Sequence, residues 1–454
     1  MTLPILGRRL TAGVSCGADV LDGAEIMRRA QGAAGELAGV DRVAVDDPDP
    51  LHRLCWLLGA DLAGAATLIV DPDWPRPQDV LDEAKPGRVV RGLPIPGEPP
   101  ETPRDDELTW FYLPTTSGSS GTPKVLARSR KSWLRSFTAL DAPLRDDDSA
   151  LIPGPLSSSL YLFGALHALH QDRDVRLLRR WSARTAAQEC LHATVVHVVP
   201  AMLAELLSVW ERHPELRDSC ALRLIVCGGA DLAPELETRL HALLPGCELL
   251  AHYGSAETSL IALRRGERRL RPVVDVEILD AQGNPASEGE LRVRSELAFD
   301  GYLRQGVLEA PESDRISVGD RAVRHDDGGL SVLGRCSATI STGGTLVAAE
   351  EVESALRGRG VREVLVAGTP HTRLGALVTA VVEVDPAAPA TREELRARVR
   401  EPEPVKRPRR WLTVPELPRT GSGKPARGVL DEWLRNGAPQ AEVLHPSTPS
   451  QERP

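Results

Sequence analysis

The segment from Tyr112 to Lys124, YLPTTSGSSGTPK, combines the residue types that bind a phosphate group. Its small residues allow several backbone N–H groups to point at one anion, its hydroxyls supply further donors, and Lys124 supplies positive charge. The spacing differs from the Walker loop, GxxxxGK[ST], because Thr122 and Pro123 separate Gly121 from Lys124. The same composition is typical of a flexible linker, so both interpretations are open at this point.

Alternating strand and helix patterns follow this segment and predict an α/β architecture. The run VVHVV before Pro200 is typical of a buried strand, and AMLAELLSVWERH after it has helical spacing. LRLIVC at 222–227, a helix over 234–244 and the strand ELLAHYG repeat the unit. Residues 275–300 predict two antiparallel strands joined by the turn AQGNPASEG. We therefore expect a large N-terminal domain of mixed sheets and helices, residues 1–334.

The pattern changes after Gly334. A helix-like AAEEVESALR precedes two strand-like runs, VREVLVAG and ALVTAVVEV, and Thr391 with Glu394 forms a capping-box pattern that begins another helix. We expect a small α+β domain over 335–435. Residues 436–454 are rich in Pro, Ser and Gln, which predicts a disordered tail.

The composition favours small-molecule chemistry in a soluble protein. A chain of 454 residues is longer than one hydrophobic core usually serves, so we expect more than one domain. A composition of 41% hydrophobic and 26% charged residues is typical of globular proteins. A net charge of -9 disfavours nucleic acid as a partner. The apolar stretch Leu54 to Val70 contains Asp61 and is too short for a membrane span, and MTLPILGRRL lacks the features of a secretory signal. We expect a cytoplasmic protein without a membrane partner.

The seven cysteines are odd in number, scattered, and without a CxxC pair, which predicts reduced thiols and neither a zinc site nor a disulfide framework. They are Cys16, Cys55, Cys190, Cys220, Cys227, Cys247 and Cys336.

Short motifs follow one another in a fixed order between Thr116 and Lys424. They are TSGSSGTPK, Gly228-Gly229-Ala230, Tyr253-Gly254-Ser255-Ala256-Glu257, Gly289-Glu290-Leu291, Gly301-Tyr302-Leu303, Gly319-Asp320, Gly334-Arg335, Gly343-Gly344 and LPRTGSGK. Each is weak alone, but their order and spacing resemble the ANL superfamily of adenylate-forming enzymes: acyl-CoA synthetases, peptide-synthetase adenylation domains and firefly-type luciferases. The first hundred residues match this pattern poorly. The resemblance implies a large ATP- and acid-binding domain followed by a small mobile domain.

The resemblance also implies a nucleotide site. Tyr253 would lie against adenine, Asp320 would accept the ribose hydroxyls, and Glu257 would hold Mg²⁺ between ATP phosphates. Lys424 would stabilise charge in the adenylation transition state, which makes it, with Glu257, the implied catalytic pair. The implied ATP phosphate-binding residues are Thr116, Ser117, Gly118, Ser119, Ser120, Gly121 and Lys124, and the implied AMP-binding residues are Gly229, Ala230, Tyr253, Gly254, Asp320 and Arg335. Taken singly, such residues are more often a core tyrosine, a turn aspartate or solvated surface charges.

The implied acid pocket contains Ser157, Ser158, His197 and Gly228. Amino-acid-activating members carry an Asp in the segment corresponding to Pro155–Ser158, which would pair with the substrate ammonium, and this chain has none there. We therefore expect an aryl acid or a short to medium carboxylic acid and not an α-amino acid. The His-Asn pair of dihydroxybenzoate enzymes is Ile152-Pro153 here, and His197 is equally interpretable as a core histidine.

The implied reaction has two steps. The acid and ATP form an acyl adenylate and pyrophosphate, and a thiol then displaces AMP. In the family the small domain rotates between the steps, with Ser337 near the hinge and Gly343 and Gly344 lining the thiol tunnel. The acceptor is coenzyme A or the phosphopantetheine of a separate carrier protein, because too few residues follow Lys424 for a further domain. The basic run from Lys406 to Arg410 is interpretable as a contact for either acceptor or as solvated charge.

Two departures from the family pattern favour a second class of function. Ala256 stands where members carry Thr or Ser, and Ser337 stands where many carry Asp or Lys. A catalytically weak protein that binds a nucleotide or acyl adenylate is the alternative. Retention of the charged site residues, Lys124, Glu257, Asp320, Arg335 and Lys424, argues for an enzyme.

Overall fold

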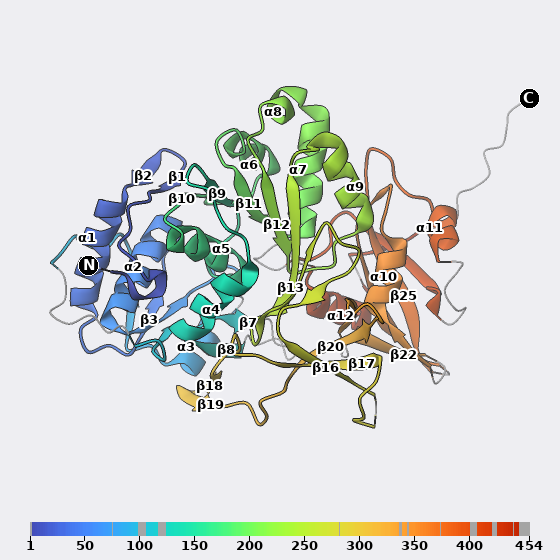
Figure 1. Ribbon diagram of the computed structural model, residues 1–454. Helices are drawn as coiled ribbons and strands as arrows, with labels where there is room; N and C mark the ends of the chain where they lie inside the picture. Colours follow the sequence, from blue (N-terminus) through green and yellow to red (C-terminus); the bar gives the residue numbers. More distant parts are fainter. Residues whose placement is uncertain are drawn as a thin grey trace, which may run out of the picture. The chain divides into compact units, whose positions relative to one another are not determined.

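The computed structural model describes residues 2–74, 76–98, 106–116, 124–280, 282–335, 338–342, 345–372, 374–399, 406–419, 425–438 and 440–444 (Figure 1). The described chain divides into two compact units. Unit 1 takes the described residues up to Val276 together with Arg292–Val318, and unit 2 takes Glu277–Leu291 and the described residues of 319–419 and 425–444.

The larger sheet of unit 1 has the strand order β15-β14-β13-β12-β11-β9-β10-β1-β2. Strands β13 to β1 along this order are parallel, whereas β14, β15 and β2 add antiparallel edges. Every residue of β11 and β12 is buried, as expected for parallel strands in a sheet covered by helices. The strands are β1 (Val14–Cys16), β2 (Asp19–Leu21), β9 (Ser149–Ile152), β10 (Asp174–Leu177), β11 (Val195–Val198), β12 (Leu224–Gly228), β13 (Glu248–Ser255), β14 (Ser259–Arg265) and β15 (Arg271–Pro272).

A second sheet of unit 1 has the order β19-β18-β8-β6-β4-β3-β5, with β7 paired to β8. Its strands are β3 (Arg42–Val45), β4 (Ala66–Ile69), β5 (Arg88–Val90), β6 (Trp110–Tyr112), β7 (Thr115–Thr116), β8 (Lys124–Ser129), β18 (Gly301–Arg304) and β19 (Val307–Glu309). The helices of unit 1 are η1 (Pro4–Leu6), α1 (Gly23–Glu36), α2 (Pro50–Ala63), α3 (Pro77–Ala84), α4 (Arg130–Leu140), α5 (Ser159–His170), α6 (Ala183–Glu189), α7 (Pro200–Arg212), α8 (Pro214–Asp218) and α9 (Pro234–Leu243). The first hundred residues, which matched the family motifs poorly, thus form β1 to β5 and α1 to α3.

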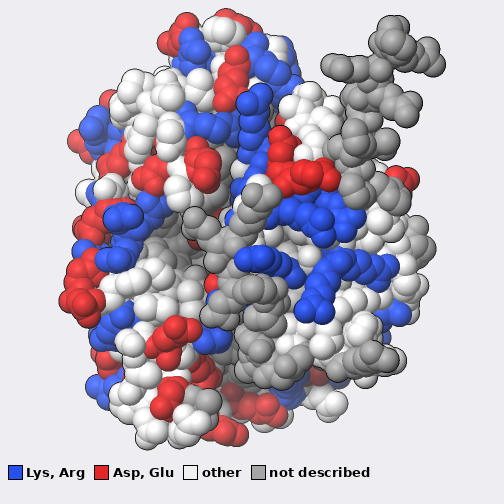
Figure 2. Space-filling model, turned by 90° about the vertical axis from the view of Figure 1, so that its right-hand side faces the viewer, with Lys and Arg blue, Asp and Glu red and all other residues white. Residues whose placement is uncertain are grey.

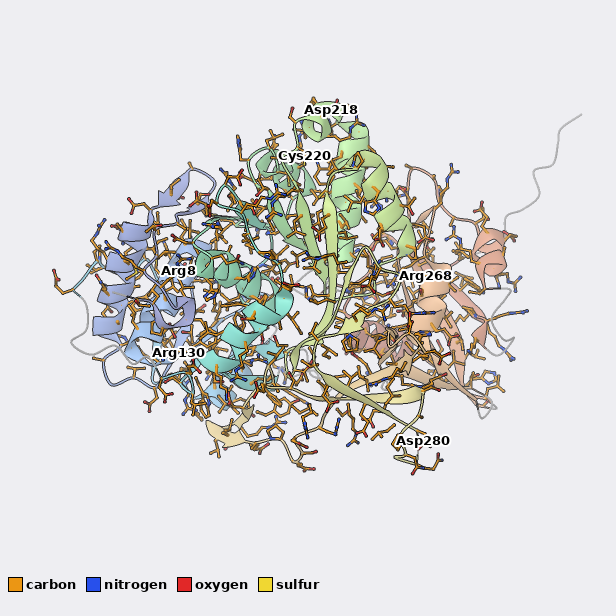
Figure 3. The ribbon with its side chains drawn as sticks, viewed as in Figure 1. Arg8, Arg130, Asp218, Cys220, Arg268 and Asp280 are labelled. Carbon is orange, nitrogen blue, oxygen red and sulfur yellow. The ribbon has the colours of Figure 1, made fainter. Side chains whose placement is uncertain are left out.

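A buried ion pair fixes the start of α4 within the core of unit 1. The Arg130 side chain, labelled in Figure 3, donates from Nε to Asp61 Oδ1 at 2.6 Å, and the two side chains are 1% and 0% exposed. Asp61 Oδ2 also accepts the backbone N–H of Ile5 at 2.8 Å. Burial raises the pKa of Asp61, and the adjacent Arg130 guanidinium opposes that rise. Asp61 of α2 therefore joins this helix to η1 and to α4.

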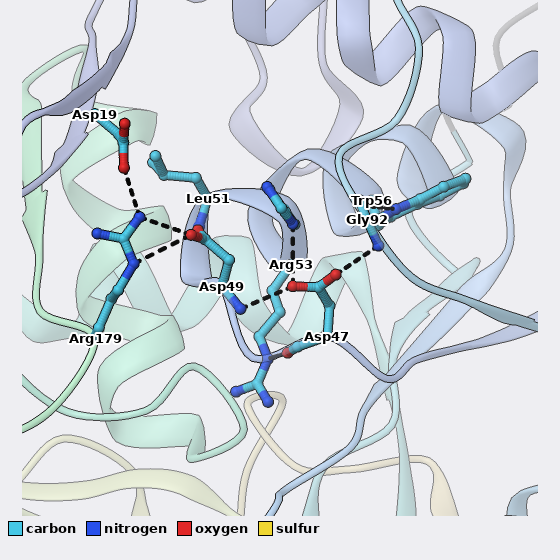
Figure 4. A network of polar contacts seen from close by, with 9 residues as sticks. Asp19, Asp47, Asp49, Leu51, Arg53, Trp56, Gly92 and Arg179 are labelled. Carbon is cyan, nitrogen blue, oxygen red and sulfur yellow. Dashed lines mark hydrogen bonds and ion pairs between the residues drawn. The ribbon is translucent and has the colours of Figure 1, made fainter.

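A second polar network surrounds the start of α2 (Figure 4). Asp49 caps this helix by accepting the backbone N–H of Leu51 at 2.9 Å, and Arg179 joins Asp49 to Asp19 with contacts of 2.7 and 2.6 Å. The Asp47 carboxylate accepts the backbone N–H of Asp49 at 2.8 Å. Segments far apart in the sequence are therefore held at one helix end by charge-assisted hydrogen bonds.

Unit 2 is built on a sheet with the order β23-β22-β25-β26-β27, with β24 paired to β25. Its strands and helices are β22 (Thr339–Thr342), β23 (Thr345–Ala348), α10 (Ala349–Leu356), β24 (Val361–His371), β25 (Gly375–Val384), α11 (Arg392–Arg398), β26 (Arg410–Val414), α12 (Arg427–Arg435) and β27 (Glu442–Val443). The capping box predicted at Thr391 and Glu394 is confirmed at the start of α11. Glu353 of α10 pairs with Arg427 of α12 at 2.7 Å.

A further sheet has the order β16-β17-β20-β21, formed by β16 (Asp275–Leu279), β17 (Glu288–Arg294), β20 (Ile316–Arg324) and β21 (Leu330–Arg335). The mixed α/β architecture with a larger and a smaller part confirms the predicted fold class. The domain boundary at 334/335 stays a prediction. Within the segment predicted to be a disordered tail from Asn436, Glu442–Val443 pair with β26 as β27. Residues 445–454 lie outside the described residues.

Within the described residues, every helix is too short or too polar to span a lipid bilayer.

Candidate active site

Glu257 lies on a tight turn between β13 and β14. The two strands pair in antiparallel register, with an irregularity between Tyr253 and Gly254. A Cβ atom on Gly254 would lie 2.0 Å from the carbonyl oxygen of Ser259, so a larger residue does not fit there. Ser259 itself adopts a φ of 58°, a left-handed conformation at the start of β14. The small residues of the motif therefore allow the turn that presents the half-buried Glu257.

Thr258 stabilises this turn from within. Its side chain is 0% exposed, its backbone N–H donates to Ser255 Oγ at 3.2 Å, and the two hydroxyl oxygens are 3.0 Å apart. Because Thr258 is buried and bonded to Ser255, its hydroxyl does not replace the one that is absent at Ala256.

Glu257 and Lys124 lie on either side of one tyrosine. The Tyr302 hydroxyl donates to Glu257 Oε1 at 3.1 Å, and Lys124 Nζ lies 5.2 Å from the centroid of the Tyr302 ring. Phe299 packs edge-on against this ring, with centroids 4.9 Å apart. Tyr302 on β18 pairs with Leu126 on β8, so the sheet register brings Tyr302 beside Lys124 of β8, and the turn between β13 and β14 brings Glu257 to the Tyr302 hydroxyl. A cation suited to phosphate and a carboxylate suited to Mg²⁺ thus lie close to each other.

Arg128 holds the turn that carries Glu257. It is 1% exposed and donates from Nη1 to the carbonyl of Ala256 at 3.0 Å and from Nη2 to the carbonyl of Leu297 at 2.7 Å. The backbone N–H of Phe299 donates to the Glu257 carbonyl at 2.7 Å. Burial lowers the pKa of Arg128 to about 10, so the guanidinium stays charged at neutral pH. Arg128 therefore joins β8 to both segments that flank the carboxylate.

The two ends of the predicted phosphate loop form a short antiparallel pair, with Thr116 opposite Lys124. The backbone of β7 and β8 therefore brings the first and last residues of the loop together. The remaining predicted phosphate-binding residues, Ser117, Gly118, Ser119, Ser120 and Gly121, lie outside the described residues, as do Lys424, Ser337, Gly343 and Gly344.

The Gly228-Gly229-Ala230 motif follows directly from β12, beside β13. Gly228 pairs with His252, and a Cβ at Gly228 would lie 2.2 Å from His252 Nε2. Gly229 has a φ of 85°, which favours glycine, and Gly229 and Ala230 are exposed. Tyr253, next to His252, is half-buried. The motif therefore lets the backbone turn at the carboxyl end of a parallel strand, where α/β sheets commonly bind ligands.

Ser157 takes part in a hydrogen-bonding network between β6 and α5. Its hydroxyl donates to Asp71 Oδ2 at 2.9 Å, and its carbonyl accepts the hydroxyl of Tyr112 at 3.2 Å. Ser158 is the N-cap residue of α5 and makes no side-chain cap hydrogen bond. Burial raises the pKa of Tyr112, which keeps its hydroxyl a donor. The two serines predicted for the acid pocket therefore differ in their hydrogen bonds: the Ser157 hydroxyl donates to Asp71, whereas the Ser158 side chain does not cap α5.

His197 is buried in β11 beneath α5. It is 3% exposed, and a Cβ at Gly164 would lie 2.7 Å from its Cγ. Burial lowers the pKa of His197 well below its usual value, and the nearby His167 and His252 lower it further. Burial likewise lowers the pKa of His167 to about 4. His197 is therefore neutral at physiological pH.

Unit 2 places Asp320 and Arg335 opposite each other on β20 and β21. Asp320 is 7% exposed, and the register shifts between Arg321 and Ala322. Gly334, before Arg335, has a φ of 110°, and a Cβ there would lie 2.0 Å from Glu350 Oε2. Only glycine adopts this backbone conformation easily, and only glycine leaves room for the Glu350 carboxylate beside it.

Two residues of this arrangement, Arg128 and Asp71, were not predicted from the sequence, and neither was the role of Tyr302. A charged residue in the otherwise apolar run VLA was the available signal for Arg128, because such a residue needs buried partners. Tyr302 belonged to a recognised motif, but its contact with Glu257 depends on how the β13–β14 turn approaches β18. Asp71 had no comparable signal.

Figure 2 shows both signs of charge over the face in view, with Lys and Arg side chains gathered toward its centre and right. Asp and Glu side chains border them. Among the described residues, His, Cys, Asp and Glu form no group of three placed to hold a metal ion.

The mixed α/β fold and the glycine-rich turns agree with an adenylate-forming enzyme of the ANL superfamily, and the family models show that membership. The model of the AMP-binding enzyme family matches residues 36–303, and the AMP-binding enzyme C-terminal domain matches residues 351–424. The chain belongs to the AMP-binding enzyme family.

Curated relatives and solved structures agree with this membership. An uncharacterised acyl-CoA ligase, YhfT of Bacillus subtilis, is 30% identical over 358 residues, which cover 75% of this chain and 71% of the relative. A salicylyl-CoA synthase / salicylate adenylyltransferase of a Streptomyces species is 28% identical over 395 residues, 78% of this chain and 70% of the relative. The crystal structure of ATP-bound MatB from Rhodopseudomonas palustris has a TM-score of 0.82 at 21% identity and covers 96% of this chain and 100% of that chain.

Proposed function

We propose that this protein activates a carboxylic acid with ATP and transfers the acyl group to coenzyme A. The acid carboxylate attacks the α-phosphorus of ATP, pyrophosphate leaves, and the thiol of coenzyme A then attacks the acyl carbon and releases AMP. The observation that carries the proposal is the pair of opposite charges around Tyr302 in unit 1. Lys124 supplies a cation suited to phosphate at the end of a loop whose composition suits an anion, and Glu257 supplies a carboxylate suited to a metal.

Glu257 fits a magnesium ion held mainly by the nucleotide. One of its oxygens accepts the Tyr302 hydroxyl at 3.1 Å, which orients the carboxylate, and carboxylate oxygens are hard ligands. A single protein carboxylate with phosphate oxygens and water is a common magnesium environment. When bound, Mg²⁺ supplies charge neutralisation for the leaving pyrophosphate. Arg128 and Thr258 would keep the carboxylate in place.

The remaining roles follow the family resemblance. Tyr253 would contact adenine, Asp320 the ribose hydroxyls, and Arg335 the phosphates. Lys424 would stabilise the charge that develops between the acid and the α-phosphate. The proposed domain 1–334 would bind ATP and the acid. The proposed mobile domain 335–435 would rotate between the two half-reactions. We place the reaction in the cytoplasm, where ATP and coenzyme A are available.

The acid is proposed to be an aryl acid or a short to medium aliphatic acid. The similarity to a salicylyl-CoA synthase supports the aryl class. The segment Pro155–Ser158 has no carboxylate for a substrate ammonium, and the neutral, buried His197 supplies no charge for one. A flat apolar ring beside a neutral histidine is compatible with these surroundings.

A carrier protein is the second candidate acceptor. The same relative is also named an adenylyltransferase, which supports adenylate formation followed by loading of a separate phosphopantetheine. The two acceptors share the first half-reaction and differ only in the thiol.

Pyrophosphate release with ATP, Mg²⁺ and an acid panel tests the proposal. The panel contains benzoate, salicylate, hexanoate and several α-amino acids, each with and without coenzyme A, with Lys424→Ala as the control. We expect aryl or aliphatic acids to support release that coenzyme A accelerates and the variant loses. Acid-dependent adenylate that coenzyme A does not discharge would favour a carrier protein. Signal from amino acids alone would overturn the acid assignment, and nucleotide binding without release would favour the weakly catalytic alternative.

A further inference from the structure

Three cysteines that are distant in the sequence converge in unit 1. Cys190 is the C-cap residue of α6, Cys220 follows α8, and Cys247 precedes β13. Figure 3 labels Cys220 close to Asp218, the last residue of α8. The three thiols are free in this structure. They do not belong to a metal cluster among the residues that the structure describes.

The chain segments that carry Cys190 and Cys220 run side by side. The backbone N–H of Ala221 donates to the carbonyl of Cys190 at 2.8 Å, and Arg223 N–H donates to the carbonyl of Thr194 at 2.8 Å. These contacts continue into the parallel pairing of β11 with β12. A disulfide requires Cα atoms about 4.4–6.8 Å apart, a spacing typical of segments joined by a backbone hydrogen bond. The side chains of Cys190 and Cys220 are close enough for each thiol to affect the pKa of the other.

The two thiols have different surroundings. Cys190 is fully buried, whereas Cys220 is partly exposed. The neighbouring Cys190 thiol lowers the pKa of Cys220, while the neighbouring Cys220 thiol and burial raise the pKa of Cys190. Cys220 is therefore the thiol that solvent reaches and that ionises first, which suits an attacking group, and Cys190 is placed behind it.

Cys247 provides a contrast. It is buried, its sulfur faces the carbonyl of Glu248 at 3.8 Å, and burial raises its pKa to about 12. It therefore remains a protonated thiol under conditions in which Cys220 reacts.

We propose that Cys190 and Cys220 form a redox-sensitive dithiol that closes to a disulfide on exposure to a low-molecular-weight disulfide. The Cys220 thiolate attacks one sulfur of the external disulfide, forms a mixed disulfide and releases one thiolate. The Cys190 thiol then gives up its proton and attacks the Cys220 sulfur, which releases the second external thiol. The two protein thiols are oxidised to one disulfide, and the external disulfide is reduced to two thiols.

The disulfide would join the end of α6 to the segment that enters β12. This bond would lie near the amino ends of β11 and β12, whereas Gly228 and Gly229 lie at the carboxyl end of β12. Closure of the loop between residues 190 and 220 restricts the unfolded chain. We therefore expect oxidation to stabilise unit 1.

Titration of the full-length protein with oxidised glutathione tests the proposal. Peptide mass mapping without reductant should show the loss of two hydrogen atoms and a Cys190–Cys220 link, and the thermal midpoint of the first unfolding transition should rise by a few degrees. Cys220→Ser should abolish the link, and Cys247→Ser, which removes the neighbouring buried thiol, should leave it unchanged. A stable glutathione adduct on Cys220 without a link, a link to Cys247, or no reaction of the folded protein would overturn the proposal. None of these readouts depends on the proposed ligase activity.

Discussion

Arg128→Met tests whether the buried guanidinium positions Glu257. The variant keeps much of the side-chain volume, but the carbonyls of Ala256 and Leu297 lose donors that lie at 3.0 and 2.7 Å. Hydrogen bonds from a charged donor each contribute about 1.5–3 kcal/mol, and removing the buried charge offsets part of the loss. We expect the free energy of unfolding to fall by about 2–4 kcal/mol, which a typical domain with ~5–15 kcal/mol tolerates.

We expect Arg128→Met to lower the rate of ATP–pyrophosphate exchange by more than it lowers the amount of folded protein. Phe299 N–H still holds the Glu257 carbonyl at 2.7 Å, so the turn shifts without being released. A displacement of about 1 Å in a catalytic group lowers rates by up to ~100-fold. We expect ATP–pyrophosphate exchange per folded molecule to fall by about 10–100-fold, with a higher Mg²⁺ midpoint and a nearly unchanged KM for the acid. Exchange rates against Mg²⁺ and urea unfolding measure both effects.

Arg130→Met is the matched control. Arg130 is as buried as Arg128, but its described hydrogen bonds go to Asp61 and to the carbonyl of Asp106. This variant should lose stability by about 3–5 kcal/mol because Asp61 is left without its partner. Its exchange per folded molecule should match the wild type. Arg128 does not position Glu257 if Arg128→Met keeps the wild-type Mg²⁺ midpoint, or if both variants lose pyrophosphate exchange equally per folded molecule.

Three further predictions concern single side chains. Tyr302→Phe keeps the aromatic ring but removes the donor to Glu257, so the Mg²⁺ midpoint for pyrophosphate exchange should rise about fivefold, equivalent to ~1 kcal/mol; an unchanged midpoint would contradict the contact at 3.1 Å. Asp61→Asn leaves Arg130 uncompensated in the core and should lower the free energy of unfolding by about 3–5 kcal/mol in urea titrations, and a loss below ~1 kcal/mol would show that the ion pair contributes little. His167 has a folded pKa of about 4, so the unfolded chain binds more protons between this value and its own pKa of about 6.5, and stability should fall as the pH is lowered across that window. His167→Leu should flatten this decline in urea titrations from pH 7 to 5, and an equal slope in both proteins would show that His167 is not its source.

Several local elements were predictable from the sequence because their causes are local. The helix over 234–244 and the strand before it appear as α9 and β12, since apolar spacing and Pro234 mark them. The capping box at Thr391 and Glu394 needs only residues three apart. The start of β27 was missed, because Leu412 and Val443 pair across a distant part of the chain.

The sequence by itself determined the class of chemistry. The order of the glycine-rich motifs, with Lys124 and Glu257 among them, indicated adenylate formation, because tight turns and anion loops need specific residue types at short spacing. The tertiary structure decided which side chains hold those groups. The approach of the β13–β14 turn to β18 brings Glu257 to Tyr302, and burial commits Arg128 to two carbonyls. The segment that enters β12 brings Cys220 beside Cys190. Such contacts depend on register and burial between distant segments, which residue types and short spacings do not specify.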